Sequence, residues 1–371
     1  MAEQRKVRVA VVFGGRSSEH AISCVTAGGV LSVIDGDRYE VVPVGIVKDG
    51  RWVLTSGDPG RLAIEGGRLP EVTADAGTAL AVPFDAGNRG LVTFEPESVP
   101  RELGEVDVVL PLLHGPYGED GTLQGLLELA DVRYVGAGVL ASAASMDKEF
   151  MKLIFAGSGL EMGPYVVVRD RAWRTERKRV FDDVDELGFP VFVKPARAGS
   201  SMGVTKVEDP AELEAAIEAA REHDPKVIVE AAISGREIEC GVLESEEGGA
   251  PDASLPAEVV VSSGHEYYDF EAKYLDDGLQ LDIPPHLPAE VIEEIRRQAA
   301  AAFDAVGGEG LARVDFFYTD NGRVLVNEIN TMPGFTPASA FPQMWAATGL
   351  DYPALVDRLL RTALNRPLGL R

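Results

Sequence analysis

The pattern of apolar and polar positions predicts that strands and helices alternate from the N-terminus onwards. A β-branched run at residues 7–13 (VRVAVVF) ends at a pair of glycines, and a helical pattern runs from about residue 22 to residue 33 after a polar loop. The nearly continuous apolar run at 106–113 is typical of a strand that a parallel sheet buries on both faces. A strand, a loop and a helix in this order indicate an α/β domain at the start of the chain.

The alternation continues through the rest of the chain, where apolar runs of strand length lie between segments of helical period. No internal repeat of fixed period is present, and a long polar and aromatic loop is predicted at 262–282. Further strands are predicted at 39–47, 51–54, 165–168, 191–194, 204–207, 227–230, 237–243 and 257–261, and further helices at about 148–156, 182–187, 210–222, 288–306 and 353–364.

Two segments depart from this alternation. Residues 57–100 contain seven glycines and five prolines, so we expect short hairpins and loops inserted into the first domain. Residues 169–179 (RDRAWRTERKR) form a basic cluster. An anion-binding patch is one interpretation of that cluster, and a solvated loop after the strand at 165–168 is the favoured one.

Composition and charge narrow the class of protein. A chain of 371 residues is long enough for two to three domains of roughly 150 residues each. The 35 basic and 60 acidic residues give a net charge of −25, which disfavours binding to nucleic acid or to an anionic membrane. No segment approaches the roughly 20 apolar residues that span a membrane. The two cysteines form no CxxC motif, so we expect a soluble cytoplasmic protein without nucleic-acid or membrane partners.

A tight hairpin is predicted near the C-terminal end. Asn-Gly is the strongest local signal for a two-residue turn, and it occurs at Asn321-Gly322 between two β-rich runs. Such a turn places Asp320 opposite Arg323 and fixes the pairing of the residues further down both strands. A different turn would shift that pairing by one residue.

The predicted pairing places Asp315 opposite Glu328 and Arg313 opposite Asn330, with all four side chains on one face. Two carboxylates that face each other directly repel. A divalent cation would compensate, because carboxylate and amide oxygens are suitable ligands for Mg²⁺. The alternative is that Arg313 neutralises the acidic pair on a solvated face.

A strand and a Gly/Ser loop at 191–204 (VFVKPARAGSSMGV) suggest a site for phosphate groups. The strand carries Lys194 within an apolar run, where an unpaired lysine is rare, and the backbone N–H groups of the loop can surround an anion. Lys148, at a predicted helix start, is a second candidate. A predicted strand ends on Glu230 and Glu237 follows in the next strand, so a nucleotide could place its base and ribose there. Two surface acids are the alternative.

Seven motifs stand along the chain in one order: GGRSSEHAIS at 14–23, LLHGPYGEDGTLQG at 112–125, SMDK at 145–148, VKPARAGSSMGV at 193–204, DFEAKY at 269–274, ARVDFF at 312–317 and NEINTMPGFTPASAFP at 327–342. With these motifs the chain resembles the D-alanine–D-alanine ligase family of the ATP-grasp superfamily. The resemblance covers nearly the whole chain, and it rests on the number and the order of these motifs.

The resemblance implies an α/β (α+β) ATP-grasp fold of three domains. Residues 1–136 would form an N-terminal domain with a parallel sheet that binds the first substrate. Residues 137–231 would form the central ATP-grasp subdomain, and residues 232–371 the C-terminal ATP-grasp subdomain with the closing loop and the metal site. A cytoplasmic homodimer that acts in peptidoglycan synthesis is implied as well.

The implied reaction joins two D-alanine molecules and consumes ATP. The γ-phosphoryl group would pass to the carboxylate of the first D-alanine, because a carboxylate does not accept an amine until one oxygen becomes a leaving group. The amine of the second D-alanine would then attack the acylphosphate, and phosphate would leave. Two Mg²⁺ or Mn²⁺ ions are implied, and a K⁺ ion is left open.

The resemblance also implies roles for single residues at the amino-acid sites. Glu19 would bind the ammonium group of the first D-alanine, and His114 would lie near the carboxylate of that substrate. Ser339 would hold the carboxylate of the second D-alanine. Ser200 and Tyr274 would join Glu19 in a hydrogen-bonded set that closes the long polar loop over the site.

At the nucleotide, Lys148 and Lys194 would bind phosphates and Lys273 would approach the γ-phosphate. The family often carries a lysine or an aromatic residue directly after the strand-end acid, whereas this chain has Ala231. The resemblance implies that Glu230, Ala232 and Ile233 contact the adenine and that Glu237 contacts the ribose.

For the chemical step, Asp315, Glu328 and Asn330 match the metal ligands, in agreement with the hairpin pairing obtained from the turn alone. Arg313 and the backbone N–H of Gly334 match the groups that stabilise an oxyanion. An arginine suits that task because it keeps its charge and donates from a fixed fork.

Other functions remain open on the sequence. A depsipeptide ligase that makes D-alanyl-D-lactate, or another ATP-grasp carboxylate–amine ligase, would differ in the closing loop, so the intact EAKY at 271–274 favours the dipeptide ligase. A nucleotide-binding oxidoreductase is suggested by VVFGG at 11–15, but GxGxxG is absent there. A non-catalytic ATP-binding module is disfavoured because every position with an implied catalytic role is filled.

Overall fold

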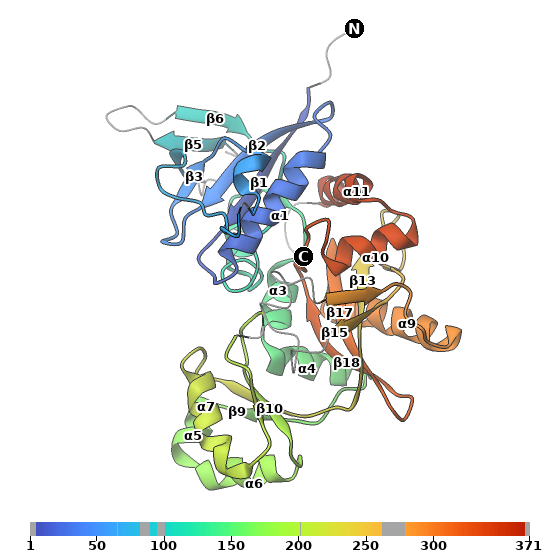
Figure 1. Ribbon diagram of the computed structural model, residues 1–371. Coiled ribbons are helices and arrows are strands. Elements are labelled where there is room, and N and C mark those ends of the chain that lie inside the picture. The colour runs from blue at the N-terminus through green and yellow to red at the C-terminus, as the bar shows by residue number, and fades with distance from the viewer. Residues whose placement is uncertain are drawn as a thin grey trace.

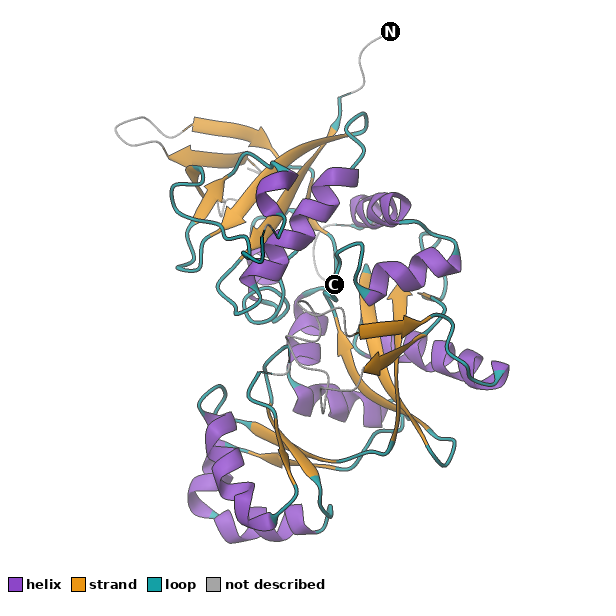
Figure 2. Ribbon diagram, viewed as in Figure 1, coloured by secondary structure: helices purple, strands orange, loops and turns teal. Residues whose placement is uncertain are grey.

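The computed structural model describes residues 5–64, 66–81, 90–94, 101–200, 202–261 and 279–367. Their strands form sheets of eight, four and six strands, each in a lobe of its own with helices packed beside it (Figures 1 and 2). The mixed α/β class expected from the sequence is confirmed. None of the helices in the described ranges has the length and apolar character needed to cross a membrane.

The N-terminal sheet is built around β1 (Val7–Gly14), most of which is buried. β1 pairs in parallel with β2 (Tyr39–Ile46) on one side and with β7 (Val108–Pro111) on the other. Helix α1 (His20–Val33) follows the glycine pair and packs against β1. The strand, loop and helix predicted for the start of the chain are therefore confirmed.

The segment 57–100 extends this sheet on its antiparallel side, in the order β6-β5-β4-β3-β2-β1-β7-β8. β4 and β5 pair antiparallel, so the expected hairpin structure is confirmed where the segment is described; residues 65, 82–89 and 95–100 lie outside the described residues. The described part of the segment contains η1 (Pro59–Leu62), β4 (Thr78–Ala81) and β5 (Gly90–Phe94). The other strands of this sheet are β3 (Trp52–Leu54), β6 (Arg101–Glu105) and β8 (Arg133–Tyr134).

The central sheet has four antiparallel strands in the order β11-β10-β12-β9. Val191 and Val193 are fully buried in the core that the sheet shares with its helices. Side chains alternate along a strand, so Lys194 points to the opposite face. The elements are β9 (Tyr165–Val168), α5 (Asp170–Thr175), α6 (Arg177–Asp185), β10 (Val191–Pro195), β11 (Thr205–Val207), η2 (Pro210–Glu212), α7 (Leu213–Arg221) and β12 (Val227–Ala231).

The expectation of a solvated loop at 169–179 is wrong, because the segment forms α5 and the beginning of α6. Trp173 is 1% exposed, and its Nε1 donates to the Glu218 carboxylate at 2.9 Å. Arg177 lies outside this core and pairs with Glu214 and Glu218. A single buried tryptophan in so polar a segment gives too weak a periodicity to predict a helix.

The third sheet contains the predicted hairpin, with β17 (Leu311–Thr319) between β13 (Gly235–Leu243) and β18 (Val324–Asn330). Helices α3 and α4 share the apolar core of this sheet, and α10 and α11 contribute to the core of the N-terminal sheet (Figure 1). The further elements are α2 (Thr122–Leu129), α3 (Val139–Met146), α4 (Lys148–Gly157), β14 (Asp252–Ala253), β15 (Ala257–Val261), β16 (Leu279–Asp282), α9 (Ala289–Ala305), α10 (Ala340–Thr348) and α11 (Tyr352–Asn365).

The turn of the β17–β18 hairpin differs from the prediction. Thr319, and not Asp320, pairs with Arg323, since the Thr319 N–H donates to the Arg323 carbonyl at 2.9 Å. The loop therefore has three residues, and it ends on Gly322 at a φ of +83°, which favours glycine. The two-residue turn predicted from Asn321-Gly322 is wrong.

The pairing at the far end of the hairpin nevertheless agrees with the prediction. A register shift beside Asp315 gives β18 one extra residue, which offsets the change in the turn. Asp315 consequently lies opposite Glu328, and Arg313 lies opposite Asn330. The sequence thus predicted the right partners through a wrong turn, because the bulge compensates for it.

The buried tryptophan of α5 gives a test of the central lobe. Trp173→Ala should lower the free energy of unfolding by roughly 3–5 kcal/mol, because it leaves a large cavity. Arg179→Ala is the matched control, since its side chain is 74% exposed, and it should change stability by less than about 0.5 kcal/mol. Urea denaturation measures both, and a small effect in both variants would support the solvated loop instead.

Candidate active site

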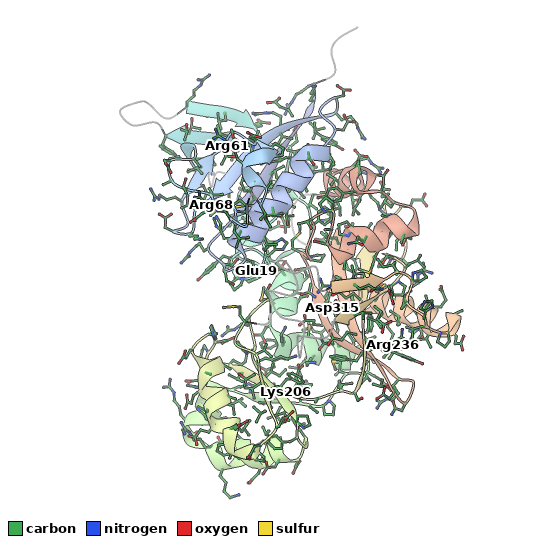
Figure 3. All side chains as sticks on the ribbon, viewed as in Figure 1. Glu19, Arg61, Arg68, Lys206, Arg236 and Asp315 are labelled. Carbon is green, nitrogen blue, oxygen red and sulfur yellow. The ribbon has the colours of Figure 1, made fainter. Side chains whose placement is uncertain are left out.

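One cavity of about 470 Å³ collects residues from all three lobes. Figure 3 labels Glu19 of the N-terminal lobe and Asp315 of β17, both beside the junction of the lobes. Lys273 and Tyr274 lie outside the described residues, and Ala232 lies beside the lining residues Ala231 and Ile233. The predicted residues that line the cavity are Glu19, His114, Lys148, Lys194, Ser200, Glu230, Ile233, Glu237, Arg313, Asp315, Glu328, Asn330, Gly334 and Ser339.

Arg313 of the β17–β18 hairpin forms an ion pair with Asp315, a carboxylate of the same hairpin. Arg313 Nε and Nη2 each lie 2.7 Å from an oxygen of Asp315, and Nε lies 3.3 Å from Glu239 on the neighbouring strand. The Asn330 side chain donates to Asp315 at 3.0 Å. Arg313 thus neutralises Asp315, as the alternative interpretation of the hairpin expected, but inside a cavity and not on a solvated face.

The opposite carboxylate has a partner from another element. Lys148 is the first residue of α4, and its Nζ lies 2.6 Å from Glu328 Oε2. Burial alone would lower the pKa of Lys148, but Glu328, Glu230 and Asp315 raise it above the ordinary value. The lysine therefore remains cationic, and it links α4 to β18.

Glu230 forms the centre of a second charged group. Its Oε2 lies 2.5 Å from Lys194 Nζ, and its Oε1 lies 2.8 Å from Lys152 Nζ. Burial by itself would raise the pKa of Glu230, but the two ammonium charges lower it well below its usual range. Sequence reasoning missed Lys152; its spacing of four from Lys148 puts both on one face of a helix and was the available signal.

The loops that follow β1 and β7 leave the same end of the parallel sheet, and they meet there. Ser17 Oγ of the first loop donates to the His114 carbonyl of the second at 2.7 Å. Ser200 reaches across from the Gly/Ser loop, and its hydroxyl donates to Glu19. The contact expected between Ser200 and Glu19 is therefore present, with Glu19 only 6% exposed.

His114 and Glu119, in the loop after β7, both contact Met332. These contacts attach that loop to the segment after β18. The Met332 carbonyl lies 3.0 Å from His114 Nδ1, and the Met332 N–H donates to Glu119 at 3.0 Å. Because a carbonyl only accepts, Nδ1 carries the proton of the ring. Burial lowers the pKa of His114, although Glu19 acts in the opposite direction, so the ring is neutral at neutral pH.

Glu119 was not assigned a role from the sequence, although it lies inside the motif LLHGPYGEDGTLQG at 112–125. Its second oxygen accepts from the Gly115 N–H at 2.6 Å. Burial and the charge of Glu19 raise its pKa to about 8, against the effect of the backbone donors and of Arg313. The sequence contains no signal for the distant partner Met332, which only the fold brings near.

The hairpin end fits a divalent cation in its donor chemistry. Asp315, Glu328 and Asn330 offer hard oxygen ligands on one cavity wall. Among the described residues, no group of three or more His, Cys, Asp or Glu side chains is placed to hold a metal ion. Two carboxylates are the usual protein share of a Mg²⁺ site that is completed by phosphates and water. The residues therefore fit an ion that binds together with a polyanion.

Comparison with known proteins gives a consistent result. The family model for the D-ala D-ala ligase N-terminus matches residues 8–137, and the model for the D-ala D-ala ligase C-terminus matches residues 154–361. A D-alanine–D-alanine ligase of Arthrobacter sp. (strain FB24) is 59% identical over 368 residues, which cover 99% of this chain and 96% of the relative.

Two solved ligase structures are similar to this chain over nearly its whole length. The VanG D-Ala:D-Ser ligase from Enterococcus faecalis has a TM-score of 0.83 and 33% identity, and the match covers 97% of this chain and 100% of that one. The D-alanine-D-alanine ligase from Coxiella burnetii has a TM-score of 0.81 and 33% identity, with 98% and 95% covered. The three-sheet arrangement is therefore that of known ligases.

The raised pKa of Glu119 predicts a pH dependence of stability. Between its ordinary value of 4.5 and about 8, the folded protein keeps a proton that the unfolded chain has lost. The contribution of this group to stability therefore falls as pH rises through that window, and it is constant above and below it. The free energy of unfolding of the wild type minus that of Glu119→Ala, from urea titrations across the window, should fall accordingly. A constant difference would mean that folded Glu119 is ionised throughout.

Proposed function

The chain belongs to the D-alanine–D-alanine ligase family, and we propose which residues of its cavity carry out the family's reaction. It is an ATP-dependent ligase that joins two D-alanine molecules in peptidoglycan synthesis. The comparisons support this activity and not the depsipeptide ligase, the oxidoreductase or the non-catalytic module considered above. One observation carries the residue assignments: one cavity holds the paired carboxylates of the hairpin, the buried lysines and the Glu19 loop.

At the nucleotide, we assign Lys148 and Lys194 to the phosphates of ATP, with Lys273 approaching the γ-phosphate. The backbone of residues 230–233 meets the adenine, and Glu237 binds the ribose hydroxyls. Phosphoryl transfer depends on positioning and charge neutralisation more than on covalent chemistry by the protein. The burial of both lysines in the cavity wall supports their assignment, because a weakly hydrated ammonium group attracts a phosphate strongly.

Asp315, Glu328 and Asn330 would hold two Mg²⁺ or Mn²⁺ ions, and an additional K⁺ ion stays open. Bound ions of this kind neutralise phosphate charge and orient the γ-phosphoryl group. Arg313 and Lys148 occupy the same carboxylates in the present structure. The assignment therefore requires both cations to turn away from the hairpin acids and toward the substrates.

At the amino-acid sites, Glu19 binds the ammonium group of the first D-alanine. Ser200 keeps Glu19 in place, and His114 lies near the carboxylate of the same substrate. Ser339 precedes α10 at the cavity wall and takes the carboxylate of the second D-alanine. Tyr274 would join this set from the segment 262–278, which lies outside the described residues.

The first D-alanine carboxylate attacks the γ-phosphorus of ATP, the bond between that phosphorus and the β,γ-bridging oxygen breaks, and ADP and an acylphosphate form. The neutral amine of the second D-alanine then attacks the carbonyl carbon, and phosphate leaves with loss of a proton from the nitrogen. Arg313 and the Gly334 N–H stabilise the oxyanion of the tetrahedral intermediate, which forms when the amine attacks and lasts until phosphate leaves. Closure of the cavity keeps water from the acylphosphate.

We further propose that the enzyme acts in the cytoplasm as a homodimer, with the domains 1–136, 137–231 and 232–371. The division follows the N-terminal, central and third sheets along the chain. Residues of α3 and α4 pack in the core of the third sheet, so they connect the last two units. Sedimentation analysis of the purified chain tests the dimer.

The activity predicts a specific product. Purified protein with ATP and Mg²⁺ should release phosphate when D-alanine is present and not with L-alanine or without an amino acid, because the Glu19 loop fixes the substrate ammonium on one side. Mass detection should identify D-alanyl-D-alanine. Turnover with a different acid and amine, and none with D-alanine, would contradict the substrate assignment.

The oxyanion assignment predicts a loss of turnover without a loss of nucleotide binding. Arg313→Ala should lower kcat roughly 100-fold or more, as expected for removal of one oxyanion donor, while the Kd for ATP changes little. Arg236→Ala is the control, because Arg236 pairs with Glu258 on β15 and does not line the cavity. Near-wild-type turnover of the Arg313 variant would remove Arg313 from the chemical step.

A further inference from the structure

Glu230 has two lysine partners, although one cation is enough to neutralise a carboxylate. Lys194 and Lys152 contact different oxygens of Glu230, at 2.5 and 2.8 Å. A buried ion pair is stable only while each charge keeps a partner. The site therefore carries one positive charge more than Glu230 needs, directly on the wall of the cavity.

The two lysines come from different lobes. Lys194 lies on β10, the strand next to β12, and it is a diagonal neighbour of Glu230 in the same sheet. Lys152 lies on α4, whose apolar residues belong to the core of the third sheet. The Lys152–Glu230 pair consequently links helix α4 to strand β12 of the central sheet at the cavity wall.

The surroundings of the two ammonium groups differ. The Lys152 side chain is 3% exposed, lies over the Tyr165 ring at 5.4 Å, and lies 3.5 Å from the Asn327 carbonyl. The Lys194 side chain is 20% exposed. Lys152 is thus enclosed on several sides, whereas Lys194 has space to move into the cavity.

We propose that Lys152 is a positioning residue that keeps Glu230 neutralised, so that Lys194 is free to turn from Glu230 to the phosphates of ATP. This inference rests on the proposed function, in which Lys194 binds phosphate. The two ammonium groups have separate tasks: Lys152 remains the counter-ion of Glu230 throughout, and Lys194 changes partner when the nucleotide enters. The backbone contacts of the adenine next to Glu230 then stay in place.

Removal of Lys152 has a specific consequence. In Lys152→Met, Lys194 becomes the remaining counter-ion of Glu230, so its movement to a phosphate would leave a buried carboxylate unpaired. The phosphates of ATP then compete with Glu230 for one lysine. Adenosine, which has no phosphate, does not depend on that competition.

The test compares ATP with adenosine. Calorimetry in the presence of Mg²⁺ should give a Kd for ATP that rises about tenfold or more in Lys152→Met, or ~1.4 kcal/mol, while the Kd for adenosine changes much less. Lys152→Arg should restore most of the affinity for ATP, because it keeps the charge. The double variant Lys152→Met/Glu230→Gln should recover the ratio of the two affinities, because no carboxylate then retains Lys194.

Lys226→Met is the matched control, since Lys226 is buried against Asp147 and Glu149 but does not line the cavity. It should leave the ratio of ATP to adenosine affinity unchanged. Equal weakening of ATP and adenosine in Lys152→Met, or no weakening of either, would overturn the inference and leave Lys152 a merely structural residue. Failure of the proposed function is distinguishable, because the wild type itself would then bind no ATP and release no phosphate with D-alanine.

Discussion

The burial of cationic side chains in one cavity depends on a carboxylate partner for each of them. Among the described lining residues these cations are Lys148, Lys152, Lys194 and Arg313. A cation removed from water without a partner is strongly destabilised, whereas a paired one tolerates burial. Several of these pairs join elements that are far apart in the sequence, such as α4 with β18 and α4 with β12. The same contacts therefore hold the lobes around the cavity. They also keep cationic side chains in its wall, where positive charge is needed to bind the phosphates of ATP.

This arrangement explains how a cavity lined by buried cations can be stable and can also accept a polyanion. Phosphate groups and divalent cations offer the lysines and the hairpin acids new partners of opposite charge, so pairs are exchanged and not broken. In the proposed mechanism, Asp315 and Glu328 would turn from Arg313 and Lys148 to metal ions, and the freed cations would face the substrates. Binding of nucleotide and metal would then be coupled through these residues. Arg313 would become available for the oxyanion only after Asp315 has another partner.

The sequence predicted those parts of the fold and of the cavity that local patterns determine. The strand at Tyr165–Val168 and the opposition of Asp315 and Glu328 are confirmed, the latter because a bulge offsets a wrong turn. Helix α5 escaped prediction because only Trp173 marks its buried face. Lys152 and Glu119 escaped because their partners, Glu230 and the Met332 backbone, become neighbours only through the fold. Local pattern thus indicates candidate groups, and pairing between distant elements decides which of them act together.

We propose that the cavity cations exchange protein carboxylates for the phosphates of ATP. A crystal structure with a non-hydrolysable ATP analogue and Mg²⁺ would show this exchange. Lys148 and Lys194 should lie at about 3 Å from phosphate oxygens, with Lys152 still paired to Glu230 and the metal on Asp315 and Glu328. Lys194 still bound to Glu230, with the phosphates held elsewhere, would contradict it.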